Sequence, residues 1–232
     1  MKKRILLIGN TNGLTGVKVD IENYKAFFLS PYGGYWNDSE IKVLLNPNKG
    51  DLLVELNWLK KLDLDYLIVI FSGHGGQERE TVLEINNNLE SINESLLKNL
   101  AKRQLNIFDC CRSFSESLVK GNLNELKLKH NLIRNTREKY EKRIIESDLG
   151  QISLYACSIG ETARDTSKGG LYSSNFIECS HTSDEEYILV SEAHEKAKIL
   201  TIQREPEQHP DADLLRSRNG QQLIIGINPK FK

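Results

Sequence analysis

The stretch YLIVIFSGHGG, residues 66–76, is one of the two most informative parts of the sequence. Its apolar beginning is typical of a strand that is buried on both faces, as in a parallel sheet. The stretch LNIFDCCRS, residues 105–113, repeats the arrangement of an apolar run followed by polar residues. Ligands of open parallel sheets bind where the carboxyl ends of the strands face solvent. We therefore expect His74 and Cys111, which follow the two strands, to lie together at that edge.

His74 and Cys111 have the chemistry of a base and its nucleophile. A thiolate is a strong nucleophile near neutral pH, and an imidazole can take the thiol proton and later pass it to a leaving amine. Side chains alternate along a strand, so we expect Asp109 and Cys111 on one side and Cys110, a packed neighbour, on the other. The amides of Gly75 and Cys111 are the predicted oxyanion site. No third triad residue is evident, and a backbone carbonyl could orient the imidazole.

Strand and helix patterns alternate along the chain, which favours an α/β fold with a mostly parallel sheet covered on both faces. The length of 232 residues suits a single domain over residues 1–232. The predicted strands are Arg4–Ile8, Ile41–Leu45, Tyr66–Phe71, Gln104–Phe108, Ile152–Ala156 and Gln222–Ile227. Helices are predicted to begin near Asp20, Asp51 (as a cap), Ser91 and Val190, and Thr81–Glu84 is predicted as a short hairpin strand.

The two motifs resemble those of the caspase/metacaspase superfamily of cysteine peptidases, with Ser-Gly-His-Gly after one strand and Asp-Cys-Cys-Arg-Ser after the next. The resemblance is closer to metacaspases, paracaspases and their bacterial relatives, because animal caspases carry Gln-Ala before the nucleophile. It extends over nearly the whole chain, through LTGVKVD (14–20), LYACS (154–158), ETARD (161–165), GGLYS (169–173), EQHP (207–210) and QLIIGI (222–227). It implies a caspase-like three-layer sandwich with a six-stranded sheet, and an endopeptidase that forms a thioester with protein substrates.

The resemblance also bears on specificity. Caspases that cut after aspartate use an arginine and a glutamine at the positions that match Leu14 and Asp109. Relatives that cut after Arg or Lys carry aspartates at the positions of Asp20 and Asp109, and carboxylates pair well with a guanidinium. We therefore expect cleavage after Arg, or Lys, with Glu161 as a candidate third carboxylate. Arg164 matches a pocket arginine of caspases, so an acidic P1 preference stays the alternative unless Arg164 binds substrate backbone.

Residues 115–148, between the predicted nucleophile and the next strand, are rich in Lys, Arg, Glu and Asn with interspersed Leu and Ile. This spacing favours amphipathic helices on the surface. The resemblance adds a second interpretation, because some family members cut this linker during activation. Arg134, Arg137, Lys142 and Arg143 are then candidate self-cleavage sites, and the surface helix is the interpretation that the pattern favours.

Composition excludes several classes of function. The formal net charge of −1 gives no strong attraction to nucleic acid or to an anionic membrane, and no apolar run reaches the length of a membrane span. We expect a cytoplasmic protein with reduced thiols, since the four cysteines show no disulfide framework. The scattered histidines lack zinc-ligand spacing, so no metal or other cofactor is predicted. The sequence leaves open both the oligomeric state and calcium activation, which many metacaspases require.

Two other classes of protein remain open. The first is a catalytically silent caspase-like scaffold, which the failure of a Cys111-directed inhibitor to react would support. The second is a small-ligand module that uses the same sheet edge, as in flavodoxin-like folds. The glycine cluster at residues 73–76 lacks the spacing of a nucleotide-binding fingerprint, which argues against this module. The resemblance to bacterial relatives suggests antiphage defence or cell death as the context.

Overall fold

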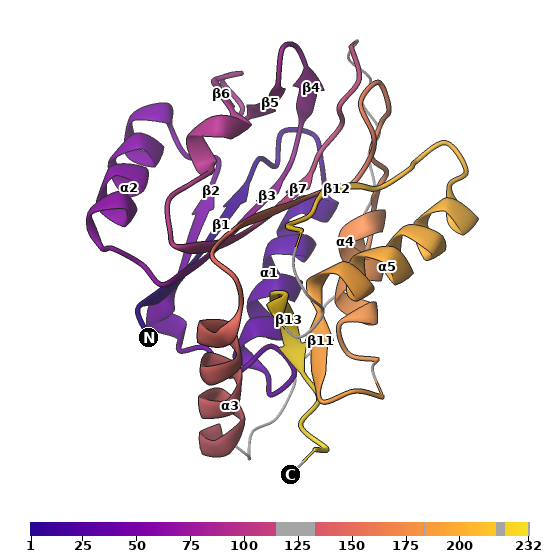
Figure 1. Cartoon of the computed structure of the whole chain (residues 1–232). Coiled ribbons are helices and arrows are strands. Elements are labelled where there is room, and N and C mark those ends of the chain that lie inside the picture. Colours follow the sequence, from indigo (N-terminus) through magenta and orange to yellow (C-terminus); the bar gives the residue numbers. More distant parts are fainter. Residues whose placement is uncertain (115–132, 183, 217–220, 232) are drawn as a thin grey trace.

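The computed structural model describes residues 1–114, 133–182, 184–216 and 221–231 (Figure 1). Its centre is a six-stranded sheet in the order β12-β8-β7-β3-β1-β2. The strands are β1 (Lys3–Gly9), β2 (Ile41–Leu45), β3 (Tyr66–Ser72), β7 (Arg103–Asp109), β8 (Gly150–Tyr155) and β12 (Asp211–Asp213). Neighbouring strands pair in parallel except β12, which pairs antiparallel with β8 at one edge. The predicted mostly parallel sheet is confirmed.

The central strands β3 and β7 carry the two motifs to one edge of this sheet. Every residue of both strands is buried, so β3 is almost wholly apolar, and the polar residues within β7 are buried as well. The register places Ser72 of β3 opposite Asp109 of β7, so the two strands end at the same level. His74 and Cys111 each follow this last pair at the same offset along the chain. Parallel pairing therefore brings both residues to the carboxyl edge.

Helices cover one face of the sheet and form the larger core with it (Figure 1). They are α1 (Gly16–Leu29), α3 (Ile133–Glu146), α4 (Leu171–Cys179) and α5 (Val190–Arg204). Strand residues such as Ile5, Leu7 and Ile68 point into this core because they occupy alternate positions of β1 and β3. The antiparallel pair β11 (Tyr187–Leu189) and β13 (Ile224–Ile227) contributes further apolar side chains to it.

The opposite face carries a second core and a different cover. It is covered by α2 (Lys49–Lys61) and by a small antiparallel sheet of β4 (Gly75–Gln77), β5 (Thr81–Glu84) and β6 (Ser91–Asn93). Cys110 is buried in this core, on the side of the sheet opposite to the helical layer. The result is a three-layer sandwich, as the resemblance implied, with one outer layer shared between a helix and a hairpin sheet.

One predicted strand lies in the wrong place. The run Gln222–Ile227 contains β13, but β13 pairs with β11 and is buried in the helical layer rather than in the central sheet. The sixth strand is β12, in which Asp211 and Asp213 are exposed. An edge strand of this kind is solvated and carries charges, so it lacks the apolar run that marks the central strands.

Two helix starts also differ from the prediction. Helix α1 begins at Gly16 rather than near Asp20, so Asp20 lies inside the helix and is buried. Helix α2 is capped by Asn48, whose side-chain oxygen accepts a 2.8 Å hydrogen bond from the Asp51 amide. Asp51, the predicted cap, therefore lies in the first turn, where an acidic side chain is also favourable.

The predicted helix near Ser91 is wrong. Ser91–Asn93 forms strand β6 and is followed by a short 3₁₀ helix at Glu94–Leu97. Pairing with β5 buries Ile92 in the second core, so tertiary packing decides the conformation of this short segment. A second 3₁₀ helix, Asp38–Glu40, precedes β2. The hairpin strand Thr81–Glu84 and the helix beginning at Val190 are confirmed.

The charged segment is helical where the structure describes it. Residues 115–132 lie outside the described residues, and α3 occupies most of the remainder of the segment. Its Tyr140 and Ile144 are buried in the larger core, so this amphipathic helix is packed on the domain rather than solvated on all sides. Arg137 pairs with Glu40 at 2.7 Å. Cleavage after Arg137 would therefore require α3 to unfold.

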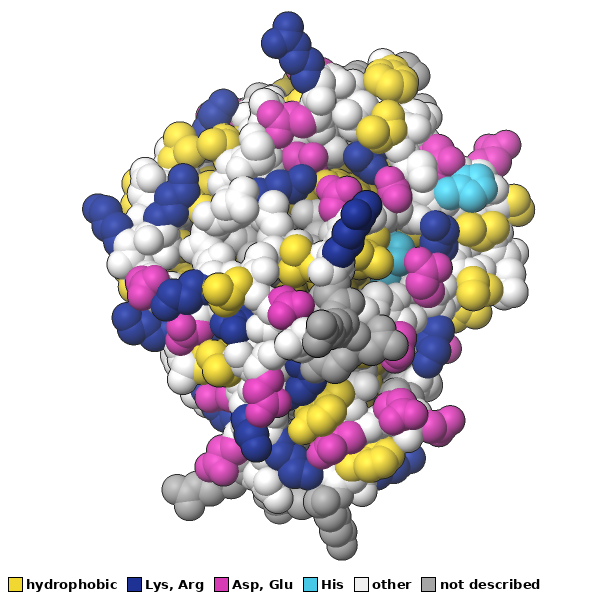
Figure 2. All heavy atoms as spheres, in the orientation of Figure 1, with side chains coloured by type: hydrophobic (Ala, Val, Ile, Leu, Met, Phe, Trp, Pro, Cys, Tyr) yellow, Lys and Arg dark blue, Asp and Glu magenta, His cyan; other side chains and the backbone are white. Residues whose placement is uncertain are grey.

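The surface carries charges of both signs. Figure 2 shows Lys and Arg side chains interspersed with Asp and Glu over the face that it draws. Among the described helices, none combines the length and the apolar character of a bilayer-spanning segment.

Candidate active site

The candidate site is a cavity at the carboxyl ends of β3 and β7. The strands are joined there by a 3.1 Å hydrogen bond from the Gly73 amide to the carbonyl oxygen of Asp109. His74 and Cys111 both line the cavity, which has a volume of about 250 Å³. The other walls come from α1, from the loop after β8 and from the segment after α5. Residues far apart in the sequence therefore meet at the edge where both motifs end.

The imidazole of His74 is oriented by a backbone carbonyl. Its Nε2 atom lies 2.5 Å from the carbonyl oxygen of Asn12, in the loop between β1 and α1. A carbonyl can only accept a hydrogen bond, so this contact assigns the ring proton to Nε2 and leaves Nδ1 as a proton acceptor. The orienting group carries no side-chain signature, so the sequence could indicate only its type.

The thiol of Cys111 is half-buried and protonated at rest. Burial raises its pKa, and the nearby Asp109 acts in the same direction. The Sγ atom lies 3.8 Å from the carbonyl oxygen of Ala163, and among the described residues no hydrogen bond joins it to His74. The thiolate therefore has to form during reaction, by proton transfer to a base in the cavity.

Gly75 brings its backbone against the cysteine loop. A Cβ atom at Gly75 would lie 2.7 Å from Cys110 Sγ and 2.9 Å from the Cys111 carbonyl oxygen, closer than side chains pack. The missing side chain therefore permits this close approach of the two chain segments. The Gly75 backbone therefore lies against that of Cys111, and its amide stays a candidate oxyanion donor.

Three carboxylates from separate segments line the same cavity: Asp20, Asp109 and Asp165. Asp20 of α1 accepts a 2.7 Å hydrogen bond from the Ser72 hydroxyl. Asp109, at the end of β7, accepts a 3.1 Å bond from the Ser173 amide. Asp165, which begins the two-residue strand β9 (Asp165–Thr166), lies opposite β10 (Gly169–Gly170).

Glycines let the backbone close around these carboxylates. A Cβ atom would collide with a carboxylate at each of three pairs, which are Gly16 with Asp165, Gly169 with Asp20, and Gly170 with Asp109. Gly169 also has a φ of +107°, a conformation that side-chain-bearing residues rarely adopt. The close approach allows amide donors to reach the oxygens, as in the 2.9 Å bond from the Gly170 amide to Asp20.

Burial perturbs all three carboxyl groups, and among the described residues none of them forms an ion pair with a Lys or Arg side chain. Burial raises the pKa of Asp109 to about 6. Burial, and next the charge of Asp109, holds the pKa of Asp20 well above its usual range. Burial also raises the pKa of Asp165. A group of acids with pKa values raised in this way favours a bound cation, and such groups concentrate at functional sites.

The expectation that Glu161 is a third carboxylate of the pocket is corrected, because Glu161 is not among the residues that line the cavity. Its carboxylate lies 2.8 Å from His209 Nδ1 and accepts bonds from the amides of Ser158 and His209. Asp165 takes the place that was expected for Glu161. Both belong to the ETARD string, and only the path of the loop decides which acid faces inward. Arg164 does line the cavity, at its mouth, with a 61% exposed side chain.

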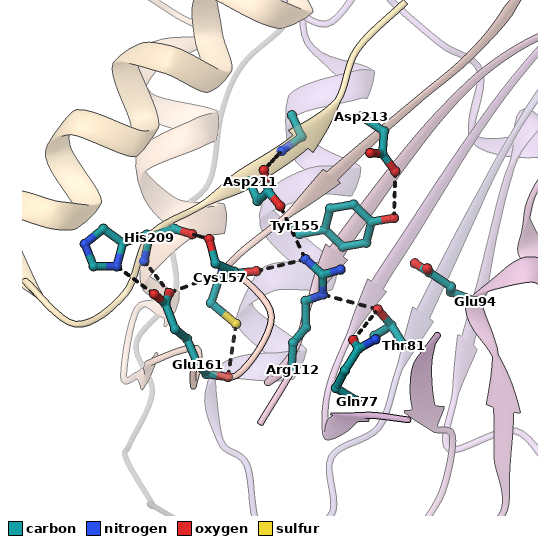
Figure 3. Close-up of polar contacts among 12 residues, drawn as sticks. Gln77, Thr81, Glu94, Arg112, Tyr155, Cys157, Glu161, His209, Asp211 and Asp213 are labelled. Atoms are coloured by element: carbon teal, nitrogen blue, oxygen red, sulfur yellow. Dashed lines mark hydrogen bonds and ion pairs between the residues drawn. The ribbon is translucent and has the colours of Figure 1, made fainter. Parts of the chain in front are cut away.

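Arg112, directly after the predicted nucleophile, anchors its loop (Figure 3). Its buried guanidinium donates to the Thr81 hydroxyl at 3.2 Å and to the Cys157 carbonyl at 3.4 Å, and it lies 3.7 Å from Asp211. Its Cζ atom lies 4.0 Å from the centroid of the Tyr155 ring. These contacts tie the loop after β7 to β5, to the end of β8 and to β12. The sequence placed this arginine in the motif but assigned it no role.

The cysteines and acidic residues bear on redox and metal chemistry. All four cysteines are free thiols in the structure. Within residues that the structure describes, no group of His, Cys, Asp and Glu is arranged to hold a metal ion. The three cavity carboxylates are instead satisfied by amide and hydroxyl donors.

The comparisons with known proteins identify the family. A family model for the caspase domain matches residues 2–206, so the chain belongs to the caspase-domain family of cysteine peptidases. It is similar in structure to caspase-1 from Spodoptera frugiperda, at 12% identity and a TM-score of 0.60, over 100% of this chain and 92% of that one. It is also similar to a protein from Geobacter sulfurreducens, at 12% identity and a TM-score of 0.57, over 96% of this chain and 100% of that one. The comparison with curated protein sequences gives no match.

The family and the caspase-like fold are thereby confirmed, and a cysteine-peptidase domain implies protein substrates. The closer likeness to metacaspases than to animal caspases stays a prediction.

Proposed function

We propose that the chain is a cysteine endopeptidase that cleaves protein substrates after arginine or lysine. The observation that carries this proposal is the set of three carboxylates, Asp20, Asp109 and Asp165, in the cavity that also holds His74 and Cys111. Burial raises the pKa of each of these carboxyl groups and so disfavours its charged form in the free protein. A P1 guanidinium or ammonium in the cavity would supply a compensating positive charge, with bidentate pairing available to arginine.

The proposed reaction is acyl transfer. Nδ1 of His74 takes the proton of the Cys111 thiol, and the sulfur attacks the scissile carbonyl carbon. The amides of Gly75 and Cys111 bind the oxygen that becomes negative in the tetrahedral intermediate. The C–N bond breaks as His74 returns the proton to the leaving amine. Water then attacks the thioester, with His74 again as base, and releases the acid and the free thiol.

Paired fluorogenic peptides that differ only at P1 test this proposal. We expect hydrolysis of the arginine peptide to exceed that of the aspartate peptide by at least about 100-fold, because the cavity presents carboxylates to the side chain. The lysine peptide should also be cut. Preference for the aspartate peptide would overturn the assignment of the carboxylates and favour Arg164 as the P1 partner. Cleavage of none of the peptides, with or without calcium, would favour the scaffold alternative.

Preference for a charged P1 side chain is expected to depend on pH. Because the pKa of Asp109 is about 6, this carboxyl is neutral below that pH and charged above it. We expect the ratio of kcat/KM for an arginine peptide to that for its citrulline counterpart to fall as the pH drops through about 6, by up to about tenfold per pH unit. Both peptides use the same Cys111 and His74, so the ratio cancels the titration of these two groups. A constant ratio from about pH 5 to 8 would contradict the role of Asp109.

Gly75→Ala is expected to lower kcat by about 100-fold, since a methyl group would push the strand away from the cysteine loop and misplace the oxyanion donors. Gly76→Ala is the matched control, because its Cβ would lie 3.5 Å from its nearest neighbour, the Ser113 carbonyl oxygen. Steady-state kinetics of both variants, with thermal melts to verify folding, make the comparison. Equal kcat values for the two variants would remove Gly75 from the proposed oxyanion site.

Defence or cell death as the biological context belongs to this proposal through the family resemblance alone. The cytoplasm as the location belongs to it through the cysteine pattern of the sequence.

A further inference from the structure

Arg164 poses a problem for a cavity that binds basic side chains. It is the sole Lys or Arg among the described residues that line the cavity. A guanidinium stays charged at every pH at which a protein is folded, so it repels a P1 arginine and attracts a P1 aspartate. The preference of the cavity therefore depends on what compensates the charge of Arg164.

The segment that follows α5 holds Arg164 at two points. Nη1 of Arg164 lies 3.0 Å from the Glu205 carboxylate. The backbone amide of Arg164 donates a 3.0 Å hydrogen bond to the side-chain oxygen of Gln208. Gln208 is fully buried and donates in turn to the carbonyl oxygen of Ala156, at 2.8 Å. A bond from the Gln208 amide to the Glu205 carbonyl keeps the segment in a turn, so both contacts act as one unit.

We propose that Glu205 is a positioning residue that determines P1 specificity by pairing with Arg164 and removing its positive charge from the mouth of the cavity. When Glu205 compensates the charge of Arg164, the carboxylates of Asp20, Asp109 and Asp165 determine the sign of the electrostatic potential in the cavity. Glu205 itself lines the cavity, so its carboxylate is also within the electrostatic reach of the substrate. This inference rests on the proposed cleavage after basic residues and adds the residue that keeps Arg164 from opposing it.

The expected effect is moderate because the pair is partly solvated. The side chain of Arg164 is 61% exposed and that of Glu205 is 27% exposed, so water screens their charges. We expect Glu205→Gln to lower kcat/KM for an arginine peptide by roughly 3- to 30-fold, mainly through KM. Hydrolysis of the aspartate peptide should rise or stay constant, so the ratio between the two peptides falls.

A double-mutant cycle tests the inference. In the Glu205→Gln background, Arg164→Gln should restore the arginine-to-aspartate ratio, because it removes the uncompensated charge. Glu205→Asp, which keeps the charge, should retain most of the wild-type ratio. Glu207→Gln is the matched control, since Glu207 lines the same cavity and has no ion pair with Arg164 among the described contacts. Arg164→Gln should not rescue any loss that Glu207→Gln causes.

The outcomes separate this inference from the proposed function. If the wild-type chain prefers arginine peptides but Glu205→Gln lowers hydrolysis of all peptides equally, Glu205 is merely structural and the inference is overturned. The same conclusion follows if Arg164→Gln fails to restore the ratio while the double variant remains folded by thermal melt. If the wild-type chain does not cleave after arginine, both the inference and the proposed function are overturned.

Discussion

Alanine in place of Cys111 is expected to lower kcat/KM for an arginine peptide by at least about 10⁴-fold, because no other group can form the thioester. His74→Ala should give a loss of similar size, since the Cys111 thiol is protonated at rest and loses its base. The pair acts as one unit, so the double variant should be no worse than either single variant. Initial rates with purified protein, measured at high enzyme concentration, are sufficient to detect the residual activity.

Cys110→Ala is the matched control for this prediction. Cys110 is 2% exposed and packs in the second core, and it also borders the cavity beside Cys111. We expect it to retain activity within about tenfold and to lose about 1–2 kcal/mol of stability through the missing sulfur. Full activity in Cys111→Ala, together with loss in Cys110→Ala, would exchange the roles of the two neighbouring cysteines.

Asp109→Asn is expected to reduce cleavage after arginine and to stabilise the free protein. The substitution removes a buried carboxylate that would face the P1 cation, so kcat/KM for the arginine peptide should fall by about 100-fold or more. The raised pKa of Asp109 means that its charged form is disfavoured in the folded state. An amide of the same shape avoids that penalty, so the free energy of unfolding near pH 8 should rise by about 1–2 kcal/mol.

The size of this stability change depends on pH. The folded pKa of Asp109 exceeds its ordinary value of 3.8, so the folded protein binds the extra proton between 3.8 and about 6. Stability therefore falls as the pH rises through this window, and the gain from Asp109→Asn should vanish near pH 4. Asp65→Asn is a useful contrast, because the pKa shift of Asp65 has the opposite direction. Hydrogen bonding to the Lys2 amide lowers the pKa of Asp65, so the folded state favours its charged form and the amide should bring no gain in stability. A melting temperature of Asp109→Asn below that of the wild type near pH 8 would contradict the account.

Sequence reasoning found the centre of the site because two independent signals agreed. The apolar runs of β3 and β7 marked them as buried strands, and the parallel register then placed His74 and Cys111 at equal offsets beyond their ends. Strand alternation also predicted that Cys110 is a packed neighbour, and Cys110 is buried in the second core. These inferences depend only on local pattern and pairing geometry, which the sequence encodes strongly.

Other parts of the site depend on loop paths that carry no periodic signal. Glu161 and Asp165 stand close together in the chain, yet only Asp165 turns into the cavity. The ion pair of Arg164 joins a partner from beyond α5, a contact that spacing cannot reveal. The edge strand β12 was missed for a related reason, since its exposed aspartates resemble a loop.

Covalent labelling with active-site-directed peptidyl ketones would report both the nucleophile and the P1 preference of the cavity in one measurement. Two probes that differ only in an arginine or an aspartate at P1 would be incubated with the full chain, followed by intact mass and peptide mapping. We expect the arginine probe to add once, at Cys111, and both Cys111→Ala and Asp109→Asn to prevent the addition. Equal or preferential labelling by the aspartate probe, or labelling at a cysteine other than Cys111, would contradict this expectation.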